Sequence, residues 1–280
     1  MGLVSGLRVI DECLSKGLVA GAFNTTNLET TMGIVRAVEA TRVPTFVQVA
    51  PTNITLSGFE YIHDMVSRRL KDVDVPVALH LDHGRTLDDV KDSLAAGFTS
   101  VMLDGAEHPF DKNVALTQQA RALTPTEYAL EAELGSIGGK EDEIGPEFAA
   151  TTDPNEVPAF VQAVGCDMLA VSVGNVHGYA PNARVDFDLL GKVKEASSVP
   201  LVIHGGSGLP VEQFGRFHEF NVVKVNIASD LRNAMIRSFG EAYVANPNEH
   251  SLIRVSTQAV AAIADVVERR IRHFNPRLGA

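Results

Sequence analysis

Short apolar runs alternate along the chain with longer segments of mixed polarity. The apolar runs are rich in β-branched residues, which favour strands, and they cover residues 18–23, 44–50, 76–82, 99–105, 127–134, 167–173, 200–205 and 222–227. Strands that alternate with helices predict parallel pairing with crossover helices. Several runs are apolar nearly throughout, as parallel strands buried on both faces are. Eight such units predict an α/β fold, a (β/α)₈ TIM barrel.

The segments between the runs carry helix signals. The segment 28–40 follows Asn27, a good N-cap residue, and the segment 86–97 ends on Gly97, a typical C-terminal stop. No linker, low-complexity segment or block of charge marks a domain boundary. We therefore expect residues 1–280 to form one TIM-barrel domain.

Net charge, cysteine content and hydropathy exclude some classes of binding partner. The chain has 280 residues and a net charge of −11, which argues against nucleic acid, because binding it needs clustered Lys and Arg. Cys13 and Cys166 are too far apart in sequence to suggest a disulfide framework or a cysteine zinc motif, which fits a reducing compartment. No uncharged apolar run reaches the roughly 20 residues of a membrane span. We expect a cytoplasmic protein with no membrane partner.

Polar residues gather where the predicted strands end. They are Asp82, His83, Asp104, Glu131, Glu133, His177, His204 and Asn226. The carboxyl ends of barrel strands meet at one rim, where barrel enzymes have their active sites, so we expect these side chains to be neighbours. A single histidine of this kind is at least as often a satisfied core group. Three histidines and several carboxylates on one rim are harder to explain in that way.

The three histidines suit a metal site. Three imidazoles from different strands, without competing thiolates, match the ligand count of a catalytic zinc site that keeps one position open. Neighbouring carboxylates can fix the tautomer of a ligand or transfer protons. Each histidine is followed by glycine, which permits a sharp turn close to a ligand.

Two further segments suggest substrate binding. "HGGSGLP" (204–210) and "VNIAS" (225–229) follow the seventh and eighth strands, where barrels often bind phosphate. Exposed N–H groups on a glycine-rich turn can hold an anion. "EAELGSIGGKEDEIGP" (131–146) has glycines and acidic residues. It is either a lid that brings a base to the substrate or a solvated acidic loop.

Together these motifs resemble a known family. "LHLDHG", "SVMLDG", "EAELGSIGG", "HGGSGLP" and "KVNIASDLR" are similar to segments of the class II, zinc-dependent ketose-bisphosphate aldolases, which include fructose- and tagatose-bisphosphate aldolases. The resemblance runs from about residue 21 to residue 232, most of the chain. It implies reversible cleavage of a ketose 1-phosphate or 1,6-bisphosphate to dihydroxyacetone phosphate and an aldehyde.

The resemblance also implies residue roles. His83, His177 and His204 would bind one zinc ion per subunit, which stabilises an enediolate as a Lewis acid. Asp82 would exchange a proton with the aldehyde oxygen, and Glu141 would remove the C–H proton next to the carbonyl.

The donor phosphate would be bound by residues on three turns: Gly178, Gly205, Gly206, Ser207, Asn226, Ile227, Ala228 and Ser229. A monovalent cation near this phosphate is a further expectation. Asp104 and Glu133 would support the zinc ligands or form an alternative metal position. The family also implies a sugar phosphate as partner and a homodimer or homotetramer.

Some questions stay open at the sequence level. A metal-dependent sugar-phosphate isomerase or epimerase shares the enediolate chemistry, and a catalytically silent sugar-phosphate-binding protein shares the site. Asn175 and Gly84 depart from the residues common in the family, so the aldehyde and its phosphorylation are not specified. The segment 256–274 predicts an amphipathic helix that packs either on its own barrel or on another subunit.

Overall fold

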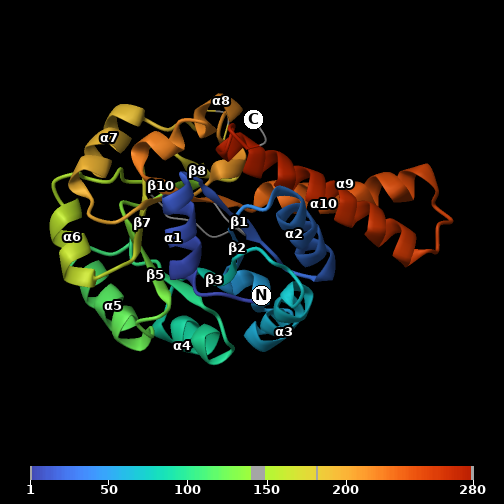
Figure 1. Cartoon of the computed structure of the whole chain (residues 1–280), viewed down its shortest axis with the longest axis horizontal. Coiled ribbons are helices and arrows are strands. Elements are labelled where there is room, and N and C mark those ends of the chain that lie inside the picture. Colours follow the sequence, from blue (N-terminus) through green and yellow to red (C-terminus); the bar gives the residue numbers. More distant parts are fainter. Residues whose placement is uncertain (1, 140–148, 181, 279–280) are drawn as a thin grey trace.

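In the residues that the computed structural model describes (2–139, 149–180 and 182–278), eight parallel strands close into a barrel, which confirms the predicted fold (Figure 1). Around the barrel their order is β1, β10, β9, β7, β5, β4, β3, β2. Their bounds are Ala20–Asn24 (β1), Thr45–Val49 (β2), Val77–Gly84 (β3), Ser100–Leu103 (β4), Ala129–Leu134 (β5), Met168–Val171 (β7), Leu201–Ile203 (β9) and Val222–Ile227 (β10). Each strand lies within a predicted run or extends it by one or two residues.

Helices follow the strands and surround the barrel (Figure 1). They are α2 (Leu28–Thr41), α3 (Phe59–Leu70), α4 (Leu87–Ala95), α5 (Phe110–Leu123), α6 (Val157–Val164), α7 (Phe187–Ala196), α8 (Val211–Phe214), α9 (Ser229–Ala245) and α10 (Leu252–Phe274), with short 3₁₀ turns η1 (Pro51–Ile54), η2 (Gly206–Gly208) and η3 (Phe217–Phe220). Asn27 caps α2 by accepting a hydrogen bond from Thr30 N at 3.0 Å, and Gly97, just past α4, has φ of 99°. Both predicted helix signals are therefore confirmed.

An additional helix, α1 (Gly6–Lys16), lies across the end of the barrel where the strands begin (Figure 1). Gly6 N donates to Thr99 O at 3.1 Å, one residue before β4. A Cβ atom on Gly6 would lie 2.8 Å from the side chains of Ser100 and Ala129, so only glycine permits this approach. The helix buries Val9, Ile10 and Cys13 against the barrel interior and closes that end; the sequence analysis did not predict it.

The barrel interior changes from apolar to polar along its axis. Side chains two residues apart on a strand share a face, so β3 directs Ala78, His80 and Asp82 inward in succession. Ala78 belongs to the apolar cluster next to α1, whereas His80 and Asp82 lie in a buried polar layer above it. The polar end of this interior is the end where the strands finish, and it contains the candidate site.

Helices α9 and α10 extend beyond the barrel as a helical hairpin (Figure 1). The C-terminal half of α10 packs on its own barrel: Ile263, Val267 and Ile271 are buried. The side chain of Asn275 accepts from Val19 N at 2.8 Å and donates to Val19 O at 2.9 Å. The part of the hairpin far from the barrel exposes large apolar side chains: Ile236, Tyr243, Val244, Leu252 and Ile253.

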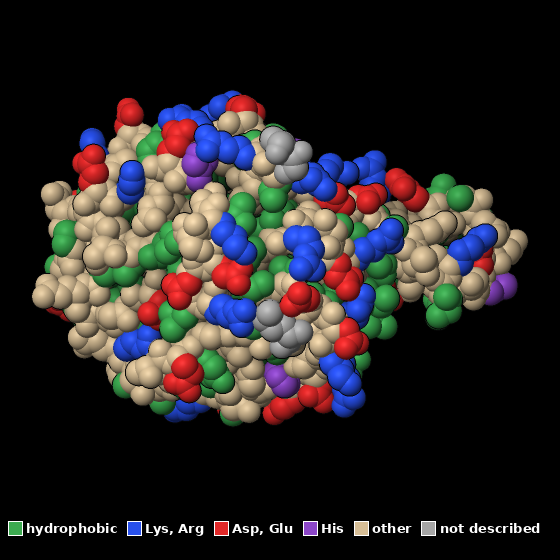
Figure 2. Space-filling view, viewed as in Figure 1, with side chains coloured by type: hydrophobic (Ala, Val, Ile, Leu, Met, Phe, Trp, Pro, Cys, Tyr) green, Lys and Arg blue, Asp and Glu red, His purple; other side chains and the backbone are tan. Residues whose placement is uncertain are grey.

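Charged side chains of both signs are interspersed on the face drawn in Figure 2, consistent with a surface that has no single basic region there. None of the helices in the described part of the chain has the length and apolar character needed to cross a membrane.

Candidate metal centre and active site

The end of β3 directs two consecutive side chains into the same space. The register between β3 and β4 shifts between Leu81 and Gly84, and His83 has φ of 48°. This irregularity breaks the alternation of an ideal strand, so that Asp82 and His83 both face the polar interior. A left-handed conformation at a non-glycine residue costs about 1–2 kcal/mol. Glycine after each histidine was expected to permit a sharp turn, but at this strand end the left-handed residue is His83 itself. Gly84 is needed because a Cβ there would lie 2.6 Å from Met102 O.

Three imidazole rings from three parts of the barrel converge at this end. The ring centroid of His83 lies 4.6 Å from that of His204 and 5.0 Å from that of His177. One ligand atom from each histidine lies within 4.8 Å of the others, and all three residues are buried or partly buried. His83 Nε2 and His204 Nδ1 are 2.8 Å apart, which identifies the nitrogen that each ring directs to the centre.

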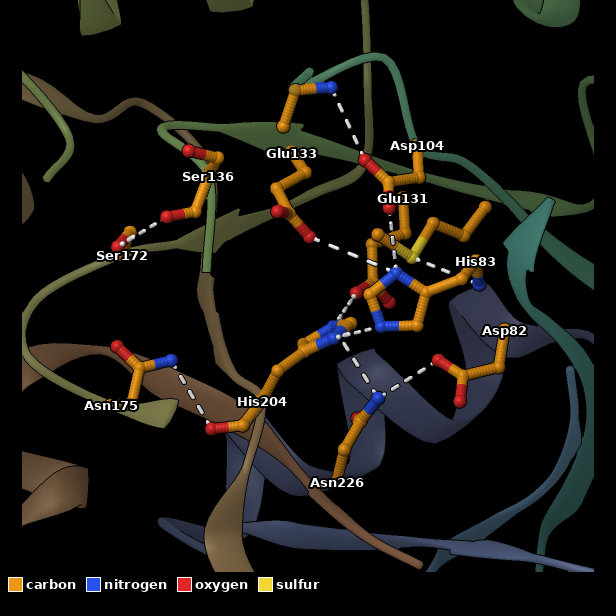
Figure 3. Close-up of polar contacts among 12 residues, drawn as sticks. Asp82, His83, Asp104, Glu131, Glu133, Ser136, Ser172, Asn175, His204 and Asn226 are labelled. Carbon is orange, nitrogen blue, oxygen red and sulfur yellow. Dashed lines mark hydrogen bonds and ion pairs between the residues drawn. The ribbon is translucent and has the colours of Figure 1, made fainter. Parts of the chain in front are cut away.

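Carboxylates hold the opposite edge of the His83 ring (Figure 3). Asp104 Oδ2 lies 2.8 Å from His83 Nδ1, and Glu133 Oε2 lies 4.0 Å from it. Burial favours the neutral acid of Asp104, but the hydrogen bond with His83, the charge of His83 and a backbone N–H group together outweigh it and lower the pKa of Asp104 to about 2. Burial, and then the charge of Asp104, raises the pKa of Glu133 well above its usual value. His83, Asp104 and Glu133 form a second group with metal-ligand spacing, on the Nδ1 side of the ring.

The His204 ring is also oriented by a carboxylate, that of Glu131. Its Nε2 lies 2.8 Å from Glu131 Oε1, and the other carboxylate oxygen of Glu131 accepts from Lys224 Nζ at 2.9 Å. Burial opposes ionisation of Glu131, but Lys224 and the hydrogen bond with His204 outweigh it and lower its pKa well below the usual value. Both His83 and His204 therefore have one ring nitrogen on a carboxylate and the other directed to the centre, the arrangement that orients histidine metal ligands.

Asp82 is fully buried and surrounded by amide donors. Among the described side chains, Asn24 Nδ2 and Gln48 Nε2 donate to its Oδ2 at 3.1 and 2.9 Å, and Asn226 Nδ2 donates to its Oδ1 at 2.9 Å. Burial favours the neutral acid, but the positive charges of His83, His204 and Lys224 outweigh it, so the pKa of Asp82 is lowered. Asp82 is a preorganised carboxylate.

His177 is positioned by a two-stranded sheet outside the barrel. Val176 and His177 form β8 (Val176–His177), which pairs in parallel with β6 (Gly138–Gly139). The sequence analysis interpreted these glycines as part of a lid or an acidic loop, but their bare backbone is what permits the pairing. A Cβ on Gly139 would lie 2.5 Å from His177 O. Just before β8, Asn175 Nδ2 donates to His204 O at 3.1 Å and ties this segment to the third histidine.

The glycine-rich turns meet beside the histidines. Gly205 has φ of 69°, and a Cβ on it would lie 2.2 Å from Val176 O. A Cβ on Gly206 would lie 2.9 Å from Asn226 O, so the turn after β9 contacts both β8 and the end of β10. Ser207 Oγ accepts from Asp230 N at 3.3 Å, in the first turn of α9. The turns predicted to bind phosphate therefore lie together, at the N-terminus of a long helix.

Comparison with known proteins now identifies the family. The family model described as "Fructose-bisphosphate aldolase class-II" matches residues 4–277. The fructose-bisphosphate aldolase of Geobacillus stearothermophilus is 34% identical over 284 residues, which cover 98% of this chain and 97% of that one. The chain belongs to the class II fructose-bisphosphate aldolase family.

Solved structures share the fold of this chain. The YdjI aldolase from Escherichia coli K12 superposes with a TM-score of 0.84 at 26% identity, over 98% of each chain. The fructose-bisphosphate aldolase from Campylobacter jejuni has the same fold, with a TM-score of 0.82 at 21% identity, over 98% of this chain and 96% of that one. This class II aldolase is thus a metal-dependent lyase, and the family acts on sugar phosphates.

The residue set of this aldolase fits a divalent metal. Three histidine nitrogens converge, two of the rings are oriented by carboxylates, and the centre lies at the carboxyl ends of the strands. Nitrogen ligands of this kind and number are those of catalytic zinc sites.

Several residues of this aldolase site were not predicted from the sequence. Asn24, Gln48, His80 and Lys224 are buried in the polar layer and contact Asp82 or Glu131. Each is a polar residue within or at the end of an otherwise apolar strand, a signal that marks the residue as unusual but does not show which groups it contacts. Glu141 lies outside the described residues, so its expected role as base stays a prediction.

Proposed function

We propose that this class II aldolase reversibly cleaves a phosphorylated ketose, a 1-phosphate or a 1,6-bisphosphate, to dihydroxyacetone phosphate and an aldehyde. The observation that carries the proposal is a buried carboxylate, Asp82, beside three converging imidazoles at the end of the barrel opposite α1; Figure 3 shows Asp82 with two of them, His83 and His204. The name of the Geobacillus relative supports a ketose bisphosphate as substrate.

In this proposal His83, His177 and His204 hold Zn²⁺. The bound ion supplies a Lewis acid that polarises the ketose carbonyl. Asp104 and Glu131 orient two of the three rings, so that the ligand nitrogens face the centre before substrate arrives. Glu133 and Asp104, on the other edge of the His83 ring, support that ligand or provide an alternative metal position.

Asp82 is proposed as the group that transfers a proton at the aldehyde oxygen. In cleavage, its carboxylate takes the proton from the hydroxyl on the carbon that becomes the aldehyde; in condensation it returns that proton. Three amide N–H groups fix its orientation and leave its charge buried next to the reacting centre. The proton of the donor carbon is assigned to Glu141, which stays a prediction.

The phosphate of the donor is proposed to bind at the joined turns: Gly178, Gly205, Gly206, Ser207 and Asn226 to Ser229. Support comes from the close contacts of Gly205 and Gly206 and from the N-terminus of α9, since backbone N–H groups at a helix start favour an anion. A monovalent cation beside this phosphate stays a prediction.

We also propose a homodimer or homotetramer. The large apolar side chains exposed on the far part of the α9–α10 hairpin support assembly through it, since exposed apolar patches mark interfaces. Light scattering coupled to size-exclusion chromatography should give two or four times the 30.0 kDa mass of the chain. A monomer at micromolar concentration would contradict this proposal.

The catalytic proposal is tested by removing the metal. Treatment with a chelator should abolish release of triose phosphate from fructose 1,6-bisphosphate and related ketose phosphates, and Zn²⁺ should restore it. Full activity of protein shown to be metal-free would refute the proposal. Conversion of the ketose to an isomer without triose phosphate would favour the isomerase alternative.

The role of Asp82 is tested separately from metal binding. Asp82→Ala should lower kcat by about 10²–10⁴-fold, the usual contribution of a positioned acid or base, while zinc content stays near that of the wild type. An unchanged kcat with zinc bound would rule out this role. Condensation of dihydroxyacetone phosphate with a panel of aldehydes, phosphorylated and not, would then identify the acceptor.

A further inference from the structure

Lys224 is a buried cation to which the proposed aldolase function assigns no role. It lies on β10, inside the barrel, with no exposed surface. Its Nζ donates to Glu131 Oε2 at 2.9 Å and to Asn226 Oδ1 at 2.7 Å. Removing a lysine from water is unfavourable unless its hydrogen bonds are replaced, and here two different acceptors replace them.

The first contact begins a hydrogen-bond chain that ends at a metal ligand. An ammonium group can only donate and an ionised carboxylate can only accept, so Glu131 accepts from Lys224 on one oxygen and from His204 Nε2 on the other. The 2.8 Å contact with Glu131 then places the His204 proton on Nε2, and the longer 3.3 Å contact of this nitrogen with Asn226 Nδ2 is not a hydrogen bond in that tautomer. His204 Nδ1 consequently presents a lone pair to the centre, where His83 Nε2 lies 2.8 Å away.

The second contact begins a chain that ends at Asp82. Because Lys224 donates to Asn226 Oδ1, the amide nitrogen of Asn226 points the other way and donates to Asp82 Oδ1 at 2.9 Å. The reversed amide would direct an oxygen at the Asp82 carboxylate and a nitrogen at the lysine, and both contacts would be repulsive. Figure 3 shows Asn226 between Asp82 and His204.

We propose that Lys224 is a positioning residue that sets the direction of both hydrogen-bond chains, so that His204 faces the metal with a lone pair and Asn226 faces Asp82 with an N–H group. The inference rests on the proposed metal-binding role of His204. One buried cation, Lys224, then preorganises both a metal ligand, His204, and the proton-transfer group, Asp82.

The test uses a pair of substitutions whose effects should not add. In Glu131→Gln, Lys224 still donates to the side-chain oxygen, which turns the amide nitrogen toward His204 and forces its proton onto Nδ1. Zinc affinity should fall by about 10–100-fold, the usual effect of losing such a partner. In Lys224→Met/Glu131→Gln, the amide is released and can accept from His204 Nε2, so zinc affinity should recover at least tenfold relative to Glu131→Gln.

Zinc affinity is measured on the full-length apoprotein by competition with a chromophoric chelator, with Co²⁺ absorption spectra as a report on ligand geometry. Lys224→Met alone should weaken zinc binding about tenfold, whereas Lys71→Met, at an exposed position, should leave it unchanged. If the double variant loses as much zinc affinity as Glu131→Gln, or more, the proposal is overturned. A lysine with only a structural role would make the two losses of zinc affinity add.

A second measurement does not depend on the folding of variants. In metal-free wild-type protein labelled with ¹⁵N-histidine, long-range correlation spectra should show His204 protonated on Nε2, with His204→Gln used for assignment. An Nδ1-protonated His204 would overturn the proposal. If the wild type shows the expected tautomer but neither binds zinc nor cleaves ketose phosphates, the proposed function fails while the role of Lys224 in orienting His204 stands.

Discussion

Replacing Gly205 by alanine should damage the metal centre through the backbone of another segment. The new Cβ would lie 2.2 Å from Val176 O and 2.6 Å from Val176 C, and these are backbone atoms, so no side chain can rotate away. A carbon rarely approaches a carbonyl oxygen closer than about 3.3 Å, so the segments must separate by about 1 Å. Val176 precedes His177, one of the proposed metal ligands, and metal-ligand distances tolerate only about 0.2 Å.

The backbone angle adds a separate penalty, and Gly17 isolates it. Gly205 has φ of 69° and Gly17 has φ of 62°, but a Cβ on Gly17 would meet nothing within 4 Å. Gly17→Ala should therefore cost only the left-handed strain, about 1–2 kcal/mol of unfolding free energy. Gly205→Ala adds overpacking of about 1–3 kcal/mol, for a total of about 2–5 kcal/mol.

Denaturant unfolding of both variants, together with zinc affinity of the apoproteins by chelator competition, measures the two effects. Gly205→Ala should bind zinc at least tenfold more weakly, and Gly17→Ala should bind it as the wild type does. If the two variants lose equal stability and both keep wild-type zinc affinity, the contact between the glycine turn and β8 does not position His177.

Two further predictions concern the rest of the molecule. Burial raises the pKa of Cys13 and of Cys166 to about 12, and because only the thiolate reacts, both should resist a thiol reagent at pH 8 in the native protein and react fully after denaturation; rapid native labelling would contradict this. Asp167 Oδ2 accepts from Leu130 N at 2.7 Å and from Arg121 Nη1 at 2.8 Å, so Asp167→Asn, which removes the charge that strengthens both contacts, should lower the unfolding free energy by about 1–3 kcal/mol without changing zinc affinity. The control Asp88→Asn, whose side chain is 82% exposed, should change stability by less than about 0.5 kcal/mol; equal losses would show that the partly buried contacts of Asp167 are unimportant.

The barrel was predictable from sequence because each strand has its own local signal. Parallel strands buried on both faces need nearly continuous apolar runs, and the helices between them have caps such as Asn27. Helix α1 was not predicted because its role depends on a cavity formed by eight distant strands. Its Gly6 is required by contact with Ser100 and Ala129, and that contact leaves no periodic mark in the sequence.

The expectation that polar residues at the ends of barrel strands meet at one rim grouped the histidines and Asp82 correctly. It could not predict the buried polar residues that lie beneath them. Gln48 and Lys224 are interior residues of apolar runs, and their polar character is meaningful only once the barrel closes and their partners are known. The same limit applies to β8: the pairing of Val176–His177 with Gly138–Gly139 joins segments that the sequence separates. Local pattern identified the groups that we propose carry the chemistry, and the closed fold identifies the residues that orient those groups.

Helix α1 has a consequence for how this enzyme can diversify. It closes the end of the barrel opposite the histidines, and the apolar layer around Ala22, Phe46 and Ala78 separates it from the polar layer. Within the barrel interior, apolar packing therefore lies at one end and the polar groups of the candidate site at the other. New acceptor preferences can arise by exchange of rim loops while the closed end stays unchanged, and stabilising substitutions around α1 should be compatible with any of them. For directed evolution, the two ends can be optimised in separate libraries and then combined.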